Sequence, residues 1–425
     1  MPTSIRETPS VRTIATRLAA AVAAIATVAA CSDDVDILKP GLPSASFMER
    51  YVALGNSLTA GLQSGGINDS TQKESYAYLL AQAAGTQFRY VAIPNGCLPP
   101  ARSFTGPLVN PQGGCAAPAP QPFVNNVGTP NASVSDLTSA YGVYAITFLN
   151  SFITGGKSQI RRAADANPTF ATIWIPNNET LAPATVGVLT PVAGGSAGLI
   201  PTATLIAGSR AAVDSLRLLS PELRGGVLIG LVDITSAPRL FKGGALFTAA
   251  GTPSALKLSI DAITGRTVTV LPNCVGSTNL VSSEIIPRIK AGTYPAIIAC
   301  EPTTITGVPA EAALGNLWIL NATEQATLSA QVKAVNDYLA AKADSIGWGY
   351  FDPNNASTGL PAMVPAGLIR EIPDFTDAVA PFGPGISTDG VHPRRPIHVA
   401  IANALIDVIN GKYGSSIPKL STTTT

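Results

Sequence analysis

Short apolar runs that alternate with helical segments are the feature of this sequence that most restricts its fold. Several runs have the length and composition of buried strands: 51–54, 88–93, 170–175, 226–232 and 347–351. The spacing of apolar residues predicts helices between or after them, at 74–84, 141–153, 204–219, 324–343 and 396–410. Strands and helices in alternation predict a parallel sheet in a three-layer α/β/α arrangement.

The first of these runs, Tyr51–Leu54, leads directly to a serine at a position suited to chemistry. The run stops at Gly55-Asn56, two residues that tolerate unusual backbone angles, and Ser57 follows at the turn. The carboxyl ends of the strands of an open parallel sheet form the edge at which such proteins bind ligands. Ser57 is therefore a candidate nucleophile, although the same position also suits the N-cap of the next helix.

Only two histidines could serve Ser57 as a base, His392 and His398. His392 follows Asp389 by three residues, in a loop just before the last predicted helix. His398 lies inside the apolar run 397–401, a context typical of a packed or capping histidine. The spacing favours His392 as the base and Asp389 as the carboxylate that holds its imidazole.

These residues lie in blocks that resemble the GDSL, or SGNH, hydrolase family. Gly55-Asn56-Ser57-Leu58 resembles the first block of that family, and Asp389-Gly390-Val391-His392-Pro393 resembles its last block. Residues 127–137 resemble the second block, and 171–179 resemble the strand that ends in Gly-x-Asn-Asp. The resemblance covers most of 51–413. It implies a flavodoxin-like, five-stranded parallel sheet, a serine esterase or lipase that works through an acyl-enzyme on Ser57, and no cofactor.

The resemblance also implies an oxyanion hole. Its donors would be the backbone N–H of Ser57, the side chain of Asn178 and a backbone N–H of the second block. Asn131 stands where the family has a glycine, and asparagine tolerates left-handed backbone geometry while keeping its N–H. Gly128 is the alternative donor. Other departures from the family pattern are Asn56, Pro176 and Glu179.

The N-terminal segment has the pattern of an export signal. Three arginines precede the apolar run Leu18–Ala30, which is too short to span a bilayer comfortably as a helix. The residues Val28-Ala29-Ala30-Cys31 resemble a bacterial lipobox, which implies lipidation of Cys31. The alternative is an ordinary secretory signal with an incidental cysteine. We therefore expect a lipoprotein signal peptide at 1–30, a tether at 31–46, and an outer-membrane lipoprotein that faces the periplasm or the cell surface.

Four further cysteines point to disulfides. An even number of cysteines in an exported protein predicts two bridges, and four cysteines allow three pairings. Proximity in sequence favours Cys97–Cys115 and Cys274–Cys300. A zinc site is disfavoured, because the sequence has no Cys-x-x-Cys and both histidines have other expected roles. We expect no metal.

The 425 residues are enough for one large domain with insertions. We expect a hydrolase domain at 47–415, loop-rich insertions at about 95–126, 241–315 and 354–385, and a disordered tail at 416–425. The charge is nearly balanced, with 27 basic and 26 acidic residues, so no nucleic-acid partner is indicated.

The leading hypothesis is an exported, lipid-anchored serine esterase. Its substrate would be an ester of a lipid, of an acetylated glycan or of a small molecule. One alternative is a surface lipoprotein that keeps the fold and binds glycan, lipid or protein without turnover. Another is an acyltransferase that uses the same serine.

Overall fold

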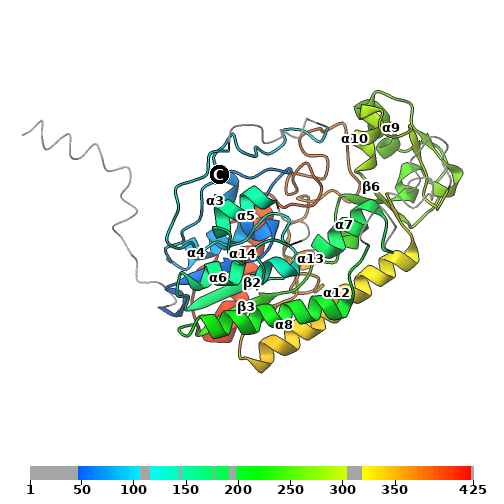
Figure 1. The fold of residues 1–425 in the computed structure, drawn as a ribbon. Coiled ribbons are helices and arrows are strands. Elements are labelled where there is room, and N and C mark those ends of the chain that lie inside the picture. The colour runs from blue at the N-terminus through cyan, green and yellow to red at the C-terminus, as the bar shows by residue number, and fades with distance from the viewer. Residues whose placement is uncertain are drawn as a thin grey trace, which may run out of the picture. The chain divides into compact units, whose positions relative to one another are not determined.

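The centre of the fold is a sheet of four parallel strands. The computed structural model describes residues 46–105, 115–142, 146–175, 178–190, 198–303 and 318–422, which all belong to the compact unit Ser44–Thr425. The strands follow the order β1-β2-β3-β9, and each neighbouring pair is parallel. Figure 1 labels β2 and β3 of this sheet. Their bounds are β1 Tyr51–Leu54, β2 Phe170–Trp174, β3 Gly225–Ile229 and β9 Gly349–Phe351. The predicted parallel α/β architecture is confirmed.

Helices cover both faces of this sheet. Successive side chains of a strand point to opposite faces, and those of β1 divide accordingly. Val52 and Leu54 belong to one hydrophobic cluster, and Tyr51 and Ala53 to another. The first cluster includes side chains of α6, α8 and α12, and the second includes side chains of α4 and α14. The bounds are α4 Tyr76–Ala83, α6 Gln159–Ala164, α8 Thr202–Leu219, α12 Ala322–Ser345 and α14 Arg395–Tyr413.

The predicted helices are found with small changes of bounds. The expected helix at 141–153 is observed as α5, Thr147–Thr154, while 143–145 lie outside the described residues. The longest helix, α12, begins with a capping box: the Asn321 side chain accepts from the Glu324 N–H, and Glu324 accepts from the Asn321 N–H. Shorter helical segments are η2 Ser46–Met48, α2 Ser57–Ala60, α3 Asp69–Lys73, η3 Val134–Leu137, α7 Asn178–Val186 and η4 Ile234–Ser236.

The predicted strand at 88–93 is wrong. The side chain of Gln72 takes up two of the hydrogen-bonding groups that this segment would offer to a sheet, accepting from the Ile93 N–H and donating to the Val91 carbonyl. The Arg89 carbonyl accepts instead from the N–H groups of Asn125 and Asn126. The position beside β1 is filled instead by Asn125 and its neighbours, where the Ala53 N–H donates to the Asn125 carbonyl. Only a single parallel bridge forms there, between Ala53 and Asn126. The expected five-stranded sheet is therefore not observed among the described residues.

The expected insertion at 241–315 has more helix than the sequence suggested. It contains α9, Ala255–Thr264, and α10, Ile285–Ala291, neither of which was predicted. A three-stranded antiparallel sheet has the order β4-β6-β8, and a parallel pair joins β5 to β7. Residues 304–317 lie outside the described part. The remaining bounds are β4 Leu240–Lys242, η5 Gly243–Leu246, β5 Thr269–Val270, η6 Pro272–Cys274, β6 Leu280–Ser282, β7 Ile297–Ile298 and β8 Ile319–Leu320.

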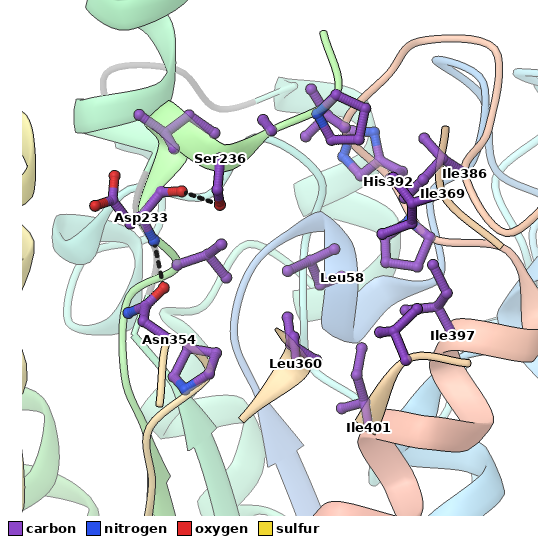
Figure 2. Close-up of a pocket in the computed structure, with 18 of the residues that line it drawn as sticks. Leu58, Asp233, Ser236, Asn354, Leu360, Ile369, Ile386, His392, Ile397 and Ile401 are labelled. Carbon is purple, nitrogen blue, oxygen red and sulfur yellow. Dashed lines mark hydrogen bonds between the residues drawn. The ribbon is translucent and has the colours of Figure 1, made fainter. Parts of the chain in front are cut away.

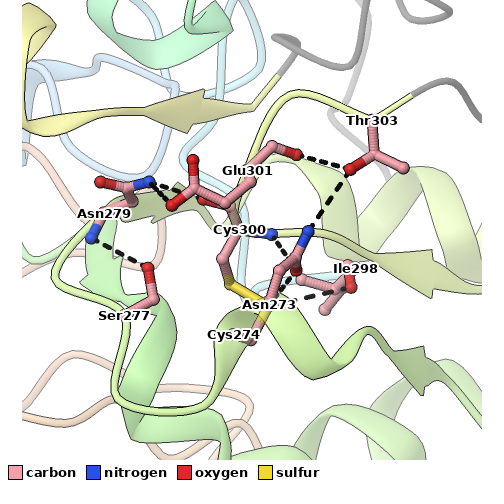
Figure 3. Close-up of a disulfide and its surroundings, with 8 residues drawn as sticks. All are labelled: Asn273, Cys274, Ser277, Asn279, Ile298, Cys300, Glu301 and Thr303. Carbon is pink, nitrogen blue, oxygen red and sulfur yellow. Dashed lines mark hydrogen bonds between the residues drawn. A yellow bond between two sulfur atoms is a disulfide. The ribbon is translucent and has the colours of Figure 1, made fainter.

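Both expected disulfides are present, Cys97–Cys115 and Cys274–Cys300. Figure 3 shows the second bridge, which ties η6 to the segment after β7. The side chain of Asn273 accepts from the Cys300 N–H, and the side chain of Asn279 donates to the Cys300 carbonyl. These contacts hold the backbone N–H and carbonyl of Cys300 beside the bridge.

The expected disorder after residue 416 is not observed as far as residue 422. Ile417 is buried, and both its N–H and its carbonyl bond to the side chain of Asn410 on α14. Leu420 forms the equivalent pair of hydrogen bonds with Asn403, which lies about two turns before Asn410 in the same helix. Two buried or half-buried asparagines thus hold the tail on α14.

The signal peptide and the lipidation site at Cys31 lie outside the described residues, as does the tether apart from Ser46. Among the helices that the structure describes, none combines the length and the apolar character needed to cross a bilayer. The third expected insertion, 354–385, contains the short helix α13, Leu360–Met363.

Candidate active site

Ser57 is the first residue of α2, and Gly55 and Asn56 separate it from the end of the Tyr51–Leu54 strand. The N-cap of this helix is Asn56, whose side chain accepts from the Leu58 N–H. Gly55 has a φ of 154°, and a Cβ there would meet the Thr59 hydroxyl at 2.3 Å. The turn therefore requires glycine, and the N-cap role considered for Ser57 belongs to Asn56.

Ser57, His392 and Asp389 lie in hydrogen-bonding contact. The Ser57 Oγ is 2.8 Å from Nε2 of His392, and Nδ1 of the same ring is 2.8 Å from Oδ2 of Asp389. Ser57 and His392 are 335 positions apart in the sequence, so the fold itself brings them together. A hydroxyl, an imidazole and a carboxylate in this order form the arrangement that activates a serine.

Hydrogen-bond donors surround the carboxylate of Asp389. Its Oδ1 accepts from the backbone N–H groups of Val391 and His392, and its Oδ2 also accepts from the Gly65 N–H. Burial raises the pKa of Asp389, but the charge and hydrogen bonds of His392 and the charge of Arg239 outweigh burial. The pKa therefore lies well below its ordinary value, and the carboxylate stays ionised.

A second set of contacts joins the two ends of the chain beside these three residues. The Ser64 N–H donates to the Ser387 hydroxyl at 2.9 Å, and the Thr388 N–H donates to the Ser64 hydroxyl at 3.2 Å. The Arg239 side chain donates to the Asp389 carbonyl and pairs with Glu284 at 2.8 Å. No local sequence pattern marks these supporting residues.

His398 lies on α14 and makes no contact with Ser57. It is fully buried, and its Nδ1 accepts from the Tyr76 N–H at 3.2 Å. Its Nε2 has no hydrogen-bond partner among the described residues. Burial, with a smaller contribution from the charge of His392, lowers the pKa of His398 to about 3. This ring is therefore neutral and packed, as its place in an apolar run predicted.

The three candidate oxyanion donors besides Ser57 have different environments. Asn178 opens α7 beyond the carboxyl end of β2, and its Nδ2 donates to the Ala132 carbonyl at 2.6 Å. Asn131 is exposed and has a φ of 57°, in the left-handed region. Gly128 donates its N–H to the Asn126 side chain at 3.1 Å. That N–H is occupied, whereas an amide nitrogen such as that of Asn178 has a second hydrogen to donate.

Gln159 is a buried residue that supports the turn at Ser57, and the sequence did not indicate this role. Gln159 of α6 accepts from the Gly55 N–H and donates to the Gly55 carbonyl and to the Thr129 hydroxyl. It thereby joins the Ser57 turn to the loop that carries Asn131. No local pattern around Gln159 marks this role.

Glu179 ties the same loop to α7. Its Oε1 accepts from the Val134 N–H at 2.6 Å, and its Oε2 is buried without a hydrogen-bond partner among the described residues. Burial raises the pKa of Glu179 to about 7, and the charge of Asp136 adds to the effect against the hydrogen bond from Val134. The sequence singled out Glu179 only as a departure from the family pattern.

A cavity of about 570 Å³ opens beside Ser57 and His392, and Asn178 also lines it. Figure 2 shows it between the loop that follows β3, which carries Asp233 and Ser236, and the first turns of α14, which carry Ile397 and Ile401. Its size falls in the range of about 300–1,000 Å³ typical of small-molecule sites.

Comparisons with known proteins give only distant likenesses, and these are to solved structures. No model of a protein family matches the chain, and no curated protein sequence matches it. Among solved structures, the chain is similar to the crystal structure of an extracellular lipase from Streptomyces rimosus, with 13% sequence identity and a TM-score of 0.34. The match covers 84% of this chain and 98% of that one. A likeness this distant does not establish a family.

Proposed function

We propose that this protein is a serine hydrolase that cleaves carboxylic esters through an acyl-enzyme on Ser57. The observation that carries the proposal is the pair of 2.8 Å contacts that link Ser57 to His392 and His392 to Asp389, at the mouth of a cavity. Serine, histidine and aspartate in this geometry serve acyl transfer on several unrelated folds.

In the proposed reaction, His392 takes the proton from the Ser57 hydroxyl as its oxygen attacks the acyl carbonyl. The tetrahedral intermediate collapses, and His392 gives that proton to the departing alcohol. Water then attacks the acyl-enzyme with His392 again as the base, which releases the acid and restores Ser57. The ionised Asp389 holds the ring in the required tautomer and stabilises the imidazolium that forms in each step.

We assign the oxyanion donors to the Ser57 N–H, the Asn131 N–H and the second hydrogen of the Asn178 amide. Gly128, the alternative to Asn131, already donates its N–H to Asn126. The left-handed conformation of Asn131 is the one that a glycine adopts easily, which fits its place in the second block. Removal of one such donor typically lowers kcat about 10²–10³-fold.

We further propose that the protein is exported and anchored by a lipid on Cys31. The two disulfides support export, because such bridges persist in oxidising compartments. We expect Cys31→Ser to move the protein from the membrane fraction to the soluble periplasmic or medium fraction. Continued membrane association of that variant would contradict the anchor and leave the catalytic proposal untouched.

The test of the catalytic proposal is ester hydrolysis by wild type and by Ser57→Ala, measured with p-nitrophenyl esters. We expect kcat to fall by at least about 10⁴-fold in Ser57→Ala, because a triad acts as a unit. The thermal unfolding of both proteins serves as the control for folding. Turnover that persists in a folded Ser57→Ala protein, or its absence from the wild type on every ester, would contradict the proposal.

A further inference from the structure

The cavity beside Ser57 is built by segments far apart in the sequence. Its walls come from Leu58 in α2, residues 232–238 after β3, residues 353–369 after β9, and the first two turns of α14. Among the described residues of the 241–303 insertion, none lines it, whereas the 354–385 insertion supplies one wall. The 354–385 insertion therefore contributes to the shape of the space next to Ser57.

The lining of this cavity is mainly aliphatic, and its polar members are Asn56, Ser57, Asn178, Asp233, Ser236, Asn354 and His392. Leucine, isoleucine, valine and proline side chains face it, and its described lining includes neither lysine nor arginine. The one carboxylate in the described lining is that of Asp233. Its Oδ1 accepts from the Thr235 N–H and hydroxyl, and its Oδ2 accepts from the Ser329 hydroxyl at 2.6 Å. These neutral donors hold the Asp233 carboxylate, and Figure 2 shows it directed away from Leu58 and Leu360, the side chains that line the pocket opposite it.

This chemistry selects against charged and sugar-like groups in the cavity. A charged group that enters an apolar space loses its hydration without compensating hydrogen bonds. Apart from the imidazole of His392, the one aromatic ring in the described lining is Trp174, which is fully buried and packs edge-on against Tyr76. It presents no exposed ring face on which a sugar could stack. An acetyl group would fill only a small part of about 570 Å³.

We propose that this cavity holds the acyl chain of an ester of a neutral, medium-chain aliphatic acid, and that Leu360 and Ile401 limit the length of that chain. The proposal deepens the serine-hydrolase function proposed above and rests on it for the position of the ester carbonyl. The chain would extend from the Ser57 hydroxyl into the cavity, and the alcohol part would remain outside.

The positions of Leu360 and Ile401 in the pocket suit them to limit the length of the acyl chain. Figure 2 shows both side chains on the side of the pocket away from His392 and Ser236. Leu360 opens α13, a short helix with no buried residue, so a larger side chain there can be accommodated with little cost to folding. Ile401 is fully buried on α14. The same insertion also carries Ile369, which lines the cavity and is 39% exposed.

The first test measures kcat/KM on p-nitrophenyl acetate, butyrate, octanoate and palmitate. Each methylene that enters an apolar pocket contributes about 0.8 kcal/mol, so we expect about a fourfold rise per methylene until the cavity is full, and a fall for palmitate. In Leu360→Trp we expect the octanoate-to-acetate ratio of kcat/KM to fall at least about tenfold. Ile401→Phe provides a second variant with the same expected change.

The matched control is Leu218→Trp, which makes the same substitution at an exposed position of α8. Leu218 is 82% exposed and does not line the cavity, so the ratio should equal that of the wild type. A wild-type kcat/KM that does not change with the length of the acyl chain would overturn the acyl-pocket proposal. An octanoate-to-acetate ratio that is unchanged in both Leu360→Trp and Ile401→Phe would also overturn it. Dependence of that turnover on Ser57 would still support the hydrolase function.

The second test does not need turnover. Calorimetry of the Ser57→Ala protein compares octanoic acid with octanedioic acid, which has the same length and a second carboxylate at its far end. We expect octanoic acid to bind at least about a hundredfold more tightly, because the second carboxylate would be desolvated against Leu360 and Ile401. Equal affinities for octanoic and octanedioic acid, or no binding of octanoic acid, would overturn the acyl-pocket proposal. Binding of octanoic acid without ester turnover by the wild type would contradict the hydrolase function alone.

Discussion

The loop 387–393 and the helix that follows it, α14, each hold one of the two histidines of the chain, and the two rings have opposite surroundings. Both are buried, His392 being 8% exposed and His398 fully enclosed. His392 has a carboxylate on one ring nitrogen and a hydroxyl on the other. His398 accepts one backbone hydrogen bond, and its other nitrogen is without a partner among the described residues. Polar partners, rather than depth of burial, therefore separate a ring suited to proton transfer from one that only packs.

The largest expected effect tests this contrast directly. His392→Ala should lower kcat on a good ester by at least about 10⁴-fold with little change in the melting temperature, because it removes the proposed base. His398→Ala should leave kcat within a few-fold of the wild type and lower the free energy of unfolding by about 2 kcal/mol, because it leaves a cavity beside Tyr76. Steady-state kinetics and denaturant unfolding of both variants provide the measurement.

The comparison fails if the two variants exchange their effects. A folded His392→Ala protein with undiminished kcat would exclude it as the base. A His398→Ala protein that unfolds like the wild type would show that the buried ring contributes no net stability.

Asn178 and Glu179, neighbours on α7, show the same difference between a residue proposed to act in the reaction and a buried residue that supports the fold. Asn178→Ala should lower kcat about 10²–10³-fold with little change in KM, because the proposed contact matures only as charge develops on the carbonyl oxygen. Asn178→Asp should be worse, since its carboxylate would face both that oxygen and the Ala132 carbonyl. The measurement is kcat and KM on one ester. Wild-type kcat in Asn178→Asp would remove Asn178 from the oxyanion hole.

Glu179 and His398 should give the free energy of unfolding opposite pH dependences. Folding raises the pKa of Glu179 from 4.5 to about 7. The contribution of Glu179 to the free energy of unfolding is therefore fully present below pH 4.5 and is lost as the pH rises from 4.5 to about 7. Folding lowers the pKa of His398 from 6.5 to about 3, so its contribution is present above 6.5 and is lost as the pH falls. Between pH 4.5 and 6.5 the two slopes oppose each other.

Single variants should separate these slopes. Glu179→Gln keeps an acceptor for the Val134 N–H, and its stability should rise with pH between 4.5 and 6.5, by up to about 1.4 kcal/mol per pH unit. His398→Ala should show a falling slope of similar size in the same window. Urea unfolding at several pH values measures both. A flat curve for Glu179→Gln would mean that the pKa shift of His398 is absent, and a flat curve for His398→Ala would mean that the pKa shift of Glu179 is absent.

The smallest expected effect concerns Asn131. If it supplies only its backbone N–H, Asn131→Gly should keep kcat or raise it slightly, because glycine adopts the same left-handed conformation more easily. Asn131→Ala serves as the matched control, since it removes the same side chain but makes that conformation costly. A large loss of kcat in Asn131→Gly alone would assign a role to the side chain.

Local patterns in the sequence were enough to predict part of this site. Ser57 follows a short apolar strand and two turn residues, and Asp389 and His392 occur three residues apart in one loop. The helices were predictable because their apolar spacing extends over several turns, as in α8 and α12. These features depend on neighbouring residues, so a single sequence contains them.

The rest depends on contacts between distant segments. The segment 88–93 has the composition of a strand, but the Gln72 side chain takes up two of its hydrogen-bonding groups. Gln159 supports the Ser57 turn from 104 positions away, with no surrounding motif. The wall that contains Leu360 belongs to an irregular stretch whose apolar residues follow no helical or strand period. Its role emerges only once the fold brings it beside Ser57.

The most direct test of the central claim is covalent labelling of Ser57 by a fluorophosphonate probe. The protein is incubated with the probe and digested, and the modified residue is identified by mass spectrometry. The account predicts one modified residue, Ser57, and labelling that is slowed by orders of magnitude in His392→Ala and is at the wild-type rate in His398→Ala. Labelling at another residue, or none in a folded wild-type protein, would contradict it.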